Sequence, residues 1–234
     1  MTKEHSRWDE VGAIWEIIDQ LRGEPGCPWD RKQTPESVQT YLIEEAHEAA
    51  SAVRMGDTVE AAEELGDLLF MVLFMIHLYE EAGAFRLERV CRLIREKMIR
   101  RHPHVFGEIS VETVQEVRDN WEQIKAGEKA ASGKQEERVP RSLPALMRAY
   151  RMASRLARDN AAAWNNPKAQ LDALETTLQR IRVTLEAQET VPGKDIGESL
   201  LILVNLARLA GYRAEDMLHE RLLDLENHGR SSDL

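Results

Sequence analysis

Apolar residues recur along almost the whole chain at spacings of three and four, which is the period of an amphipathic helix. Glycine and proline fall between these periodic segments rather than inside them, so they mark helix ends and turns. The pattern predicts an all-α fold. In the first half, helices are expected over residues 7–22, 35–55, 58–82, 87–101 and 111–126. In the second half, they are expected over residues 143–159, 167–190, 195–210 and 214–228.

A change in composition divides the chain. Residues 127–142 (GEKAASGKQEERVPRS) are small, charged and interrupted by glycine and proline, which is typical of a linker. On either side of it, a glycine is followed by an acidic residue and an apolar helix, GDLLFMVLFMIHL from Gly66 and GESLLILVNLARL from Gly197. This weak repeat predicts two tandem, related helical units, residues 1–126 and residues 143–234.

Pairs of acidic residues on the second and third predicted helices are the strongest candidates for chemistry. Glu45 and Glu48 are three residues apart and share a helix face, as do Glu64 and Asp67. In an antiparallel hairpin with its turn at Gly56, Glu48 and Glu64 would lie at similar heights, since each is eight positions from that glycine. Carboxylates flanked by apolar residues suit a hard cation, so Mg²⁺ is expected, and Mn²⁺ can substitute for it.

Two other interpretations of these acids remain open. The chain has 41 acidic and 31 basic residues and a formal charge of −10, so the acids could simply form solvated helix faces. The segment from Glu44 to His47 also contains an ExxH, as carboxylate-bridged di-iron bundles do. Such bundles need a second ExxH, which the segment from Glu64 to Asp67 does not supply, so magnesium is favoured.

Composition narrows the classes of partner and compartment. The negative charge argues against general nucleic-acid binding, but not against a nucleotide, because a metal ion can bridge carboxylates and phosphates. The two cysteines, Cys27 and Cys91, form no CxxC pair, so neither a disulfide scaffold nor a cysteine zinc site is expected. The longest apolar run, Leu68 to Ile76, spans nine residues, about half of a membrane crossing. We therefore expect a soluble, cytoplasmic protein with no membrane partner.

The acidic motifs EEAHE (44–48) and EELGD (63–67) resemble the EExxE…ExxD signature of MazG-type nucleoside triphosphate pyrophosphohydrolases. The resemblance continues in order, almost through the whole chain, in CPWDRKQT (27–34), RRHPHVFG (100–107), NWEQIK (120–125) and PRSLPALMRA (140–149). It implies a homodimer in which helices of two subunits pack into four-helix-bundle-like cores. It also implies hydrolysis of NTPs and dNTPs to the monophosphate and pyrophosphate, which would remove aberrant or excess nucleotides.

The resemblance further implies roles for individual residues. The expected Mg²⁺ ligands are Glu45, Glu48, Glu64 and Asp67. Glu44 would position or activate the attacking water, or support the ligands. Phosphate-binding cations are expected at Lys97 and Arg101, with further nucleotide contacts at Trp121 and Lys125.

The loop before the second predicted helix is a second candidate for substrate binding. It carries Trp29, Asp30 and Gln33, whose aromatic face and polar groups could read a base or sugar. Trp29 could equally fill a gap in the core.

The second half keeps the pattern of the first but not its acids. When the two halves are aligned on Trp164, the positions of Glu44, Glu45 and Glu48 hold Thr176, Thr177 and Arg180. The acids of the third predicted helix are replaced by Asp195 and Glu198, and the expected basic pair is replaced by Arg221 and Leu225. Two carboxylates facing Arg180 favour a salt bridge over a magnesium site. The second unit is therefore predicted to be a degenerate copy that serves packing, dimerisation or regulation.

Three alternative functions remain at the level of sequence. A dUTP or dCTP pyrophosphatase, or a phosphoribosyl-ATP pyrophosphohydrolase, would use the same four acids. A non-catalytic nucleotide sensor would account for the degenerate second half. The extended matches at CPWD and RRHPHVF favour broad specificity, and the intact first set of acids favours an enzyme.

Overall fold

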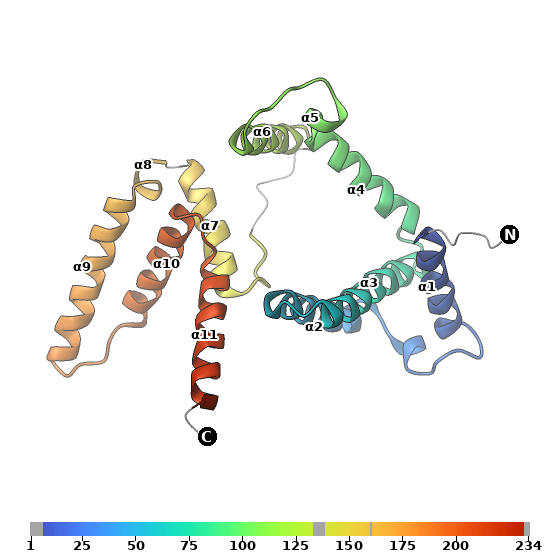
Figure 1. Ribbon diagram of the computed structural model, residues 1–234, viewed down its shortest axis with the longest axis horizontal. Helices are drawn as coiled ribbons and strands as arrows, with labels where there is room; N and C mark the ends of the chain where they lie inside the picture. The colour runs from blue at the N-terminus through green and yellow to red at the C-terminus, as the bar shows by residue number, and fades with distance from the viewer. Residues whose placement is uncertain (1–6, 133–138, 160, 232–234) are drawn as a thin grey trace. The chain divides into compact units, whose positions relative to one another are not determined.

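The computed structural model describes residues 7–132, 139–159 and 161–231, and these residues form helices, turns and loops with no strand. For this part of the chain, the predicted all-α class is confirmed. The chain divides into two compact units, Met1–Gly133 and Lys134–Leu234 (Figure 1). No described helix is both long and apolar enough to cross a membrane.

A long helical hairpin is the centre of the first unit. Its two helices are α2 (Pro35–Met55) and α3 (Thr58–Glu81), which pack against each other along their length (Figure 1). The other elements of this unit are α1 (Arg7–Arg22), the short 3-10 helix η1 (Asp30–Lys32), α4 (Leu87–Arg101), α5 (Pro103–Phe106) and α6 (Val114–Ser132). Helix α1 packs on α3, and α6 packs on α4.

Local sequence signals fix the two ends of this hairpin. Thr34 caps α2 by accepting a hydrogen bond from the backbone of Ser37, whose side chain in turn accepts one from the Thr34 N–H. At the turn, Gly56 adopts a left-handed conformation with φ of 71°, which glycine reaches without a steric penalty. Asp57 then caps α3 by accepting two backbone N–H groups of its first turn, at 3.0 and 3.1 Å.

The core of the first unit lies toward the end of the hairpin that is away from the Gly56 turn. Ile18 from α1, Val38 from α2 and Leu73, Phe74 and Leu78 from α3 form one buried cluster. Because these side chains join α1 to the hairpin, they also fix the start of the loop that connects α1 to α2. The middle of the hairpin, which carries the predicted acids, is left outside this cluster.

Helix α6 is longer than the sequence pattern indicates. It continues to Ser132, whereas the linker was predicted to begin at residue 127. Glu128 forms ion pairs with Arg100 and Arg101 of α4, and this tertiary contact supports helix where the composition indicated a linker. The other residues that α6 contains beyond residue 126 are rich in good helix formers. Residues 133–138 of the predicted linker lie outside the described residues.

The second unit contains a similar hairpin. It is formed by α9 (Pro167–Glu186) and α10 (Gly193–Leu209), with α7 (Ala145–Asp159) packed on α10. Two further helices, α8 (Ala161–Trp164) and α11 (Ala214–Ser231), complete it. The short elements η1, α5 and α8 were not predicted, because three or four residues are too few to show a helical period.

Candidate active site

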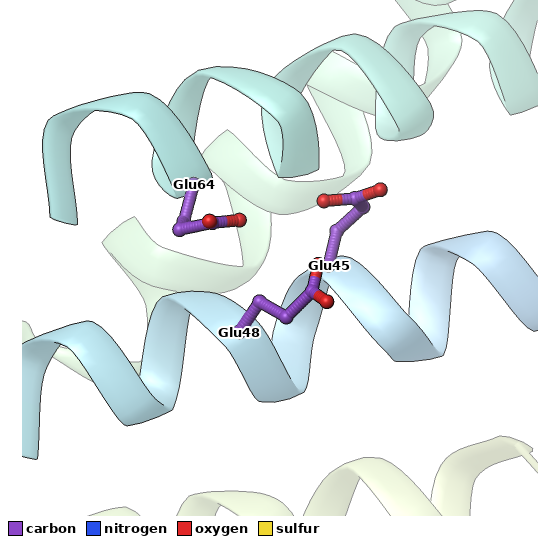
Figure 2. Close-up of side chains that lie close together, drawn as sticks. All are labelled: Glu45, Glu48 and Glu64. Carbon is purple, nitrogen blue, oxygen red and sulfur yellow. The ribbon is translucent and has the colours of Figure 1, made fainter. Parts of the chain in front are cut away.

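Three glutamates from the α2–α3 hairpin come together in the first unit. Carboxylate oxygens of Glu45, Glu48 and Glu64 all lie within 4.8 Å of one another. Glu45 and Glu48 extend from α2, and Glu64 extends toward them from the facing helix α3 (Figure 2). The structure therefore brings together three of the four predicted metal ligands, and we call them the glutamate cluster.

The three carboxylates of the glutamate cluster repel one another. Burial and repulsion from Glu48 and Asp67 raise the pKa of Glu45. Burial and repulsion from Glu48 and Glu60 raise the pKa of Glu64. Within the described residues, no basic side chain forms an ion pair with any of the three glutamates. Such an arrangement favours the binding of a cation, which would remove the repulsion.

The donor set fits a hard divalent ion. Three carboxylates at this spacing match the oxygen ligands that Mg²⁺ and Mn²⁺ use, and they leave octahedral positions for water and phosphate oxygens. His47, the histidine of the ExxH, is exposed and does not belong to the group of converging ligand atoms, which weakens the di-iron alternative. The fit is therefore to magnesium or manganese rather than to a site with nitrogen ligands.

The remaining two predicted acids lie at the edge of the cluster. Asp67 is exposed and follows Glu64 by one helical turn; its charge helps to raise the pKa of both Glu45 and Glu64, so it is nearby. It is nevertheless outside the group of three converging carboxylates. Glu44 is also exposed, and its charge raises the pKa of Glu45. Their roles as fourth ligand and water-positioning group stay predictions.

An exposed aromatic pair lies close to the glutamate cluster. Trp29 is 53% exposed, so it does not fill a gap in the core. Its ring meets the ring of Tyr41 edge to face, with centroids 5.9 Å apart. Tyr41 precedes Glu45 by four residues and therefore lies one turn away on the same face of α2. Tyr41 was not predicted as a site residue, although its spacing of four residues from Glu45 was a signal that could have identified it.

The two polar candidates of the same loop are engaged within the protein. Asp30 is buried, at 9% exposure, and its backbone carbonyl accepts a hydrogen bond from Arg22. The amide nitrogen of Gln33 donates to the carbonyl of Trp29 at 3.1 Å, and its amide oxygen accepts from the Ser37 hydroxyl at 2.7 Å. In this structure both residues shape the loop, and Trp29 offers the exposed surface.

Three of the predicted nucleotide-contacting residues meet where α4 packs on α6. The Arg101 guanidinium lies 5.2 Å from the ring centre of Trp121, and the Lys125 ammonium lies 4.8 Å from it. Arg101 also forms a 2.6 Å ion pair with Glu128, a residue that the sequence analysis did not single out. Hydrogen bonds from Arg101 and Arg100 lower the pKa of Glu128 to about 2.

Lys97 has a different environment from Arg101, although both are on α4. It lines a cavity of about 330 Å³ together with apolar side chains that include Phe85, Leu93 and Ile94. The lining of this cavity is therefore partly apolar and includes one of the two predicted phosphate-binding cations.

The corresponding face of the second unit holds an ion pair. The Arg180 guanidinium lies 2.8 Å from Asp195 and 3.1 Å from Glu198, and it donates to the Thr177 hydroxyl at 3.3 Å. The hydrogen bond with Asp195 raises the pKa of Arg180. The predicted salt bridge is thus confirmed, and the two carboxylates that correspond to Glu64 and Asp67 are neutralised by a side chain of the protein itself.

Comparisons with known proteins agree on one family. The model of the MazG nucleotide pyrophosphohydrolase domain matches residues 33–106, which contain the glutamate cluster, Lys97 and Arg101. The nucleoside triphosphate pyrophosphohydrolase of Escherichia coli (strain K12) is 36% identical over 220 residues, covering 91% of this chain and 82% of that protein. The nucleoside triphosphate pyrophosphohydrolase/pyrophosphatase MazG of Thermotoga maritima is 36% identical over 219 residues, covering 90% and 82%. A solved mazG-related protein from Thermotoga maritima is 29% identical and covers 49% of this chain and 98% of that chain, with a TM-score of 0.44.

Proposed function

The chain belongs to the MazG nucleotide pyrophosphohydrolase family, and on this premise we propose that it hydrolyses nucleoside and deoxynucleoside triphosphates to the monophosphate and pyrophosphate. The observation that carries the proposal is the convergence of Glu45, Glu48 and Glu64 without a basic partner among the described residues. The relatives' names, as nucleoside triphosphate pyrophosphohydrolases, support the reaction class.

The proposed reaction is in-line attack of water on the α-phosphorus. The water oxygen forms a bond to this phosphorus, and the bond between this phosphorus and the oxygen that bridges it to the β-phosphorus breaks. Pyrophosphate leaves with that oxygen, and the proton lost by the water passes to solvent. Glu45, Glu48 and Glu64 would bind Mg²⁺, with Asp67 as a fourth ligand, and Glu44 would orient the water. Bound Mg²⁺ would supply charge neutralisation at the phosphates and acidify water.

Positive and aromatic residues of α4 and α6, together with Trp29 of the loop before α2, would bind the rest of the nucleotide. Arg101, Lys125 and Lys97 carry the positive charge that a triphosphate needs, and the first two both contact the ring of Trp121. The exposed face of Trp29 suits a base that stacks on an aromatic ring, and the Trp29 ring contacts Tyr41, which lies one helical turn from Glu45. A stacking surface tolerates different bases, which agrees with a broad role in removing aberrant or excess nucleotides.

The proposed enzyme is a homodimer. The hairpin exposes large apolar side chains in the described structure, among them Ile43, Val53, Val59, Leu65 and Leu69. A second copy packed on the hairpin would remove such side chains from water, and helix-on-helix packing would then form the four-helix-bundle-like core that the resemblance implies. Sedimentation equilibrium tests this proposal: a single species with the mass of one chain would contradict it.

Hydrolysis in water labelled with ¹⁸O tests the proposed reaction. The protein is incubated with Mg²⁺ and a panel of NTPs and dNTPs, and the products are identified by ³¹P NMR and mass spectrometry. Monophosphate that carries the label, with unlabelled pyrophosphate, is the expected result, because attack at the α-phosphorus leaves the new oxygen there. Label in pyrophosphate would place the attack at the β-phosphorus. Diphosphate and inorganic phosphate would mean that a different bond is cleaved.

A further inference from the structure

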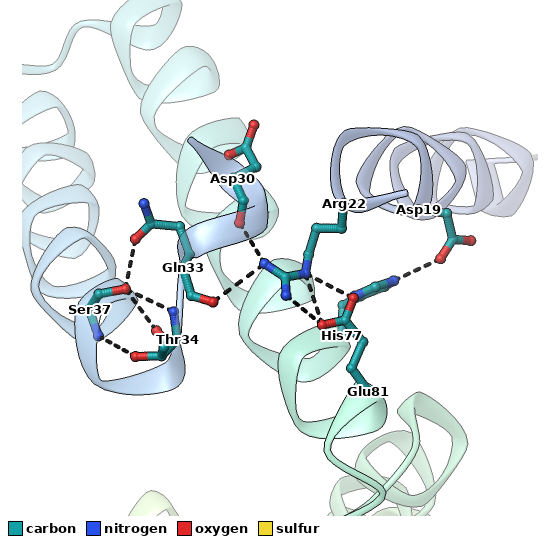
Figure 3. A network of polar contacts seen from close by, with 8 residues as sticks. All are labelled: Asp19, Arg22, Asp30, Gln33, Thr34, Ser37, His77 and Glu81. Carbon is teal, nitrogen blue, oxygen red and sulfur yellow. Dashed lines mark hydrogen bonds and ion pairs between the residues drawn. The ribbon is translucent and has the colours of Figure 1, made fainter. Parts of the chain in front are cut away.

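The last residue of α1 joins three parts of the first unit through one guanidinium group. Arg22 donates through Nε and Nη2 to the carboxylate of Glu81 in α3, at 2.6–2.9 Å. Its Nη1 donates to the backbone carbonyl of Asp30 and, at 3.4 Å, to that of Gln33 (Figure 3). Only 11% of the Arg22 side chain is exposed, so these contacts are largely shielded from water.

The two carbonyls that Arg22 binds lie at the two ends of η1. Asp30 begins this short helix, and Gln33 is the residue that follows it. The side chain of Gln33 connects the loop to α2, because it donates a hydrogen bond to the carbonyl of Trp29 and accepts one from Ser37 in the first turn of α2. The orientation of the Arg22 guanidinium therefore affects the position of the Trp29 backbone through a short chain of hydrogen bonds.

Glu81 also lies beside a buried histidine, one helical turn earlier in α3. One of its oxygens lies 3.5 Å from Nδ1 of His77, whose Nε2 lies 2.7 Å from Asp19 in α1. The Arg22 guanidinium also lies 5.7 Å from the centre of the Phe74 ring, in the core of the unit. The guanidinium is thus anchored by a carboxylate and an aromatic ring on α3, which leaves its Nη1 side directed at the loop.

We propose that the Arg22–Glu81 pair positions the loop of residues 27–34 for nucleotide binding, so that Arg22 is a positioning residue for the proposed reaction. The inference rests on the proposed function, in which the exposed ring of Trp29 receives the base. Arg22 does not touch the glutamate cluster in this role. Its effect is to hold the aromatic surface at a fixed place relative to the carboxylates of α2, and it acts on substrate binding rather than on the chemical step.

The second unit offers a matched control. There Arg208 of α10 donates to the carbonyl of Trp164 at 2.8 Å, and Asn205 donates to the same oxygen at 3.1 Å. An arginine thus binds a backbone carbonyl before the first hairpin helix in both units, although it comes from α1 in one and from α10 in the other. Because the described residues of the second unit contain no such glutamate cluster, loss of the Arg208 contact should affect the structure of that unit and leave substrate binding unchanged.

The test compares Arg22→Lys with Arg208→Lys in the full chain. Lysine keeps the charge but carries its donors on a single nitrogen, so it cannot reproduce the contacts that the guanidinium makes to Glu81 on one side and to the loop carbonyls on the other. For Arg22→Lys, KM for a dNTP should rise on the order of tenfold, because hydrogen bonds to a charged donor are lost, while kcat stays within about twofold of wild type. Hydrogen exchange should accelerate at the amides of Arg31, Lys32 and Gln33. Arg208→Lys should leave KM unchanged and accelerate exchange only in its own unit.

A second variant distinguishes a loss of positioning from a folding defect. Glu81→Gln keeps an acceptor for Arg22 but removes the ion pair, so a smaller rise in KM is expected than for Arg22→Lys. If Arg22→Lys keeps the KM of wild type, or lowers kcat at unchanged KM as a partly unfolded preparation would, the positioning role is overturned. If the wild-type chain turns over no triphosphate at all, the proposed function is wrong. If wild type is active and Arg22→Lys is unaffected, only the positioning role of Arg22 is wrong.

Discussion

The guanidinium of Arg180 lies 2.8 Å from the carboxylate of Asp195, in the second unit, at the place where Glu48 faces Glu64 in the first. One hairpin thus joins unlike charges across its two helices, and the other joins like charges. The first arrangement is stable without a ligand, whereas the second favours the binding of a cation. The same helical frame therefore supports a structural contact in one unit and a candidate metal site in the other.

Because Arg180 neutralises Asp195, we predict that the Asp195→Ala variant hydrolyses triphosphates at the rate of wild type. Arg180 is 46% exposed, so loss of its partner should lower the free energy of unfolding only slightly. Asp172→Ala, which removes the partner of Lys168 on the same unit, is the matched control for an exposed pair. Both variants are compared by thermal unfolding and by the rate of pyrophosphate release. A folded Asp195→Ala chain without turnover would mean that the second unit takes part in catalysis.

Repulsion within the glutamate cluster predicts how stability responds to Mg²⁺. In chelator, Glu64→Gln should unfold at the same temperature as wild type or higher, because the substitution removes one of three converging charges. Mg²⁺ at ten times its dissociation constant should stabilise wild type by about 1.4 kcal/mol and should have little effect on Glu64→Gln. Differential scanning calorimetry with Mg²⁺ and with chelator makes the comparison, and equal Mg²⁺ effects in both proteins would exclude Glu64 as a ligand.

The ion pairs of Glu128 predict a dependence of stability on pH. The pKa of this carboxyl is lowered from 4.5 to about 2 in the folded chain, so its contribution to stability is fully present above pH 4.5 and is lost as the pH falls toward 2. Glu128→Gln should therefore be less stable than wild type at pH 7, and the difference should shrink toward zero near pH 2. Urea unfolding of both proteins across this range measures it. A difference that stays constant with pH would show that the ion pairs do not cause it.

The exposed ring of Trp29 predicts a defect in binding without a defect in folding. Trp29→Ala should raise KM about tenfold, since stacking of a base on an aromatic ring contributes about 1–3 kcal/mol. The thermal midpoint should change little, because the ring is 53% exposed. Trp8→Ala is the control, since Trp8 is 73% exposed and lies in α1. If both variants keep the KM of wild type, Trp29 does not receive the base.

Local signals in the sequence were sufficient for most helix limits and for the glutamate cluster. Thr34, Pro35 and Gly56 set the ends of α2, and spacings of three residues place acids on one face of a helix. The predicted end of α6 was wrong because Glu128 forms ion pairs with two arginines of α4, and composition alone does not show that contact. Arg22 and Glu81 were missed for the same reason: 59 residues separate them, so their pairing is a consequence of how α1 packs on α3.

Turnover of a dNTP, measured with Mg²⁺ and with chelator for wild type, Glu48→Gln and Glu63→Gln, tests the role of the glutamate cluster most directly. Glu63 is an exposed neighbour of Glu64 outside the cluster, so it controls for loss of negative charge on the hairpin. Wild type and Glu63→Gln should release pyrophosphate only with Mg²⁺, and Glu48→Gln should lose activity by about a hundredfold or more while it stays folded. Wild-type turnover in Glu48→Gln, or turnover that persists in chelator, would contradict catalysis at this cluster.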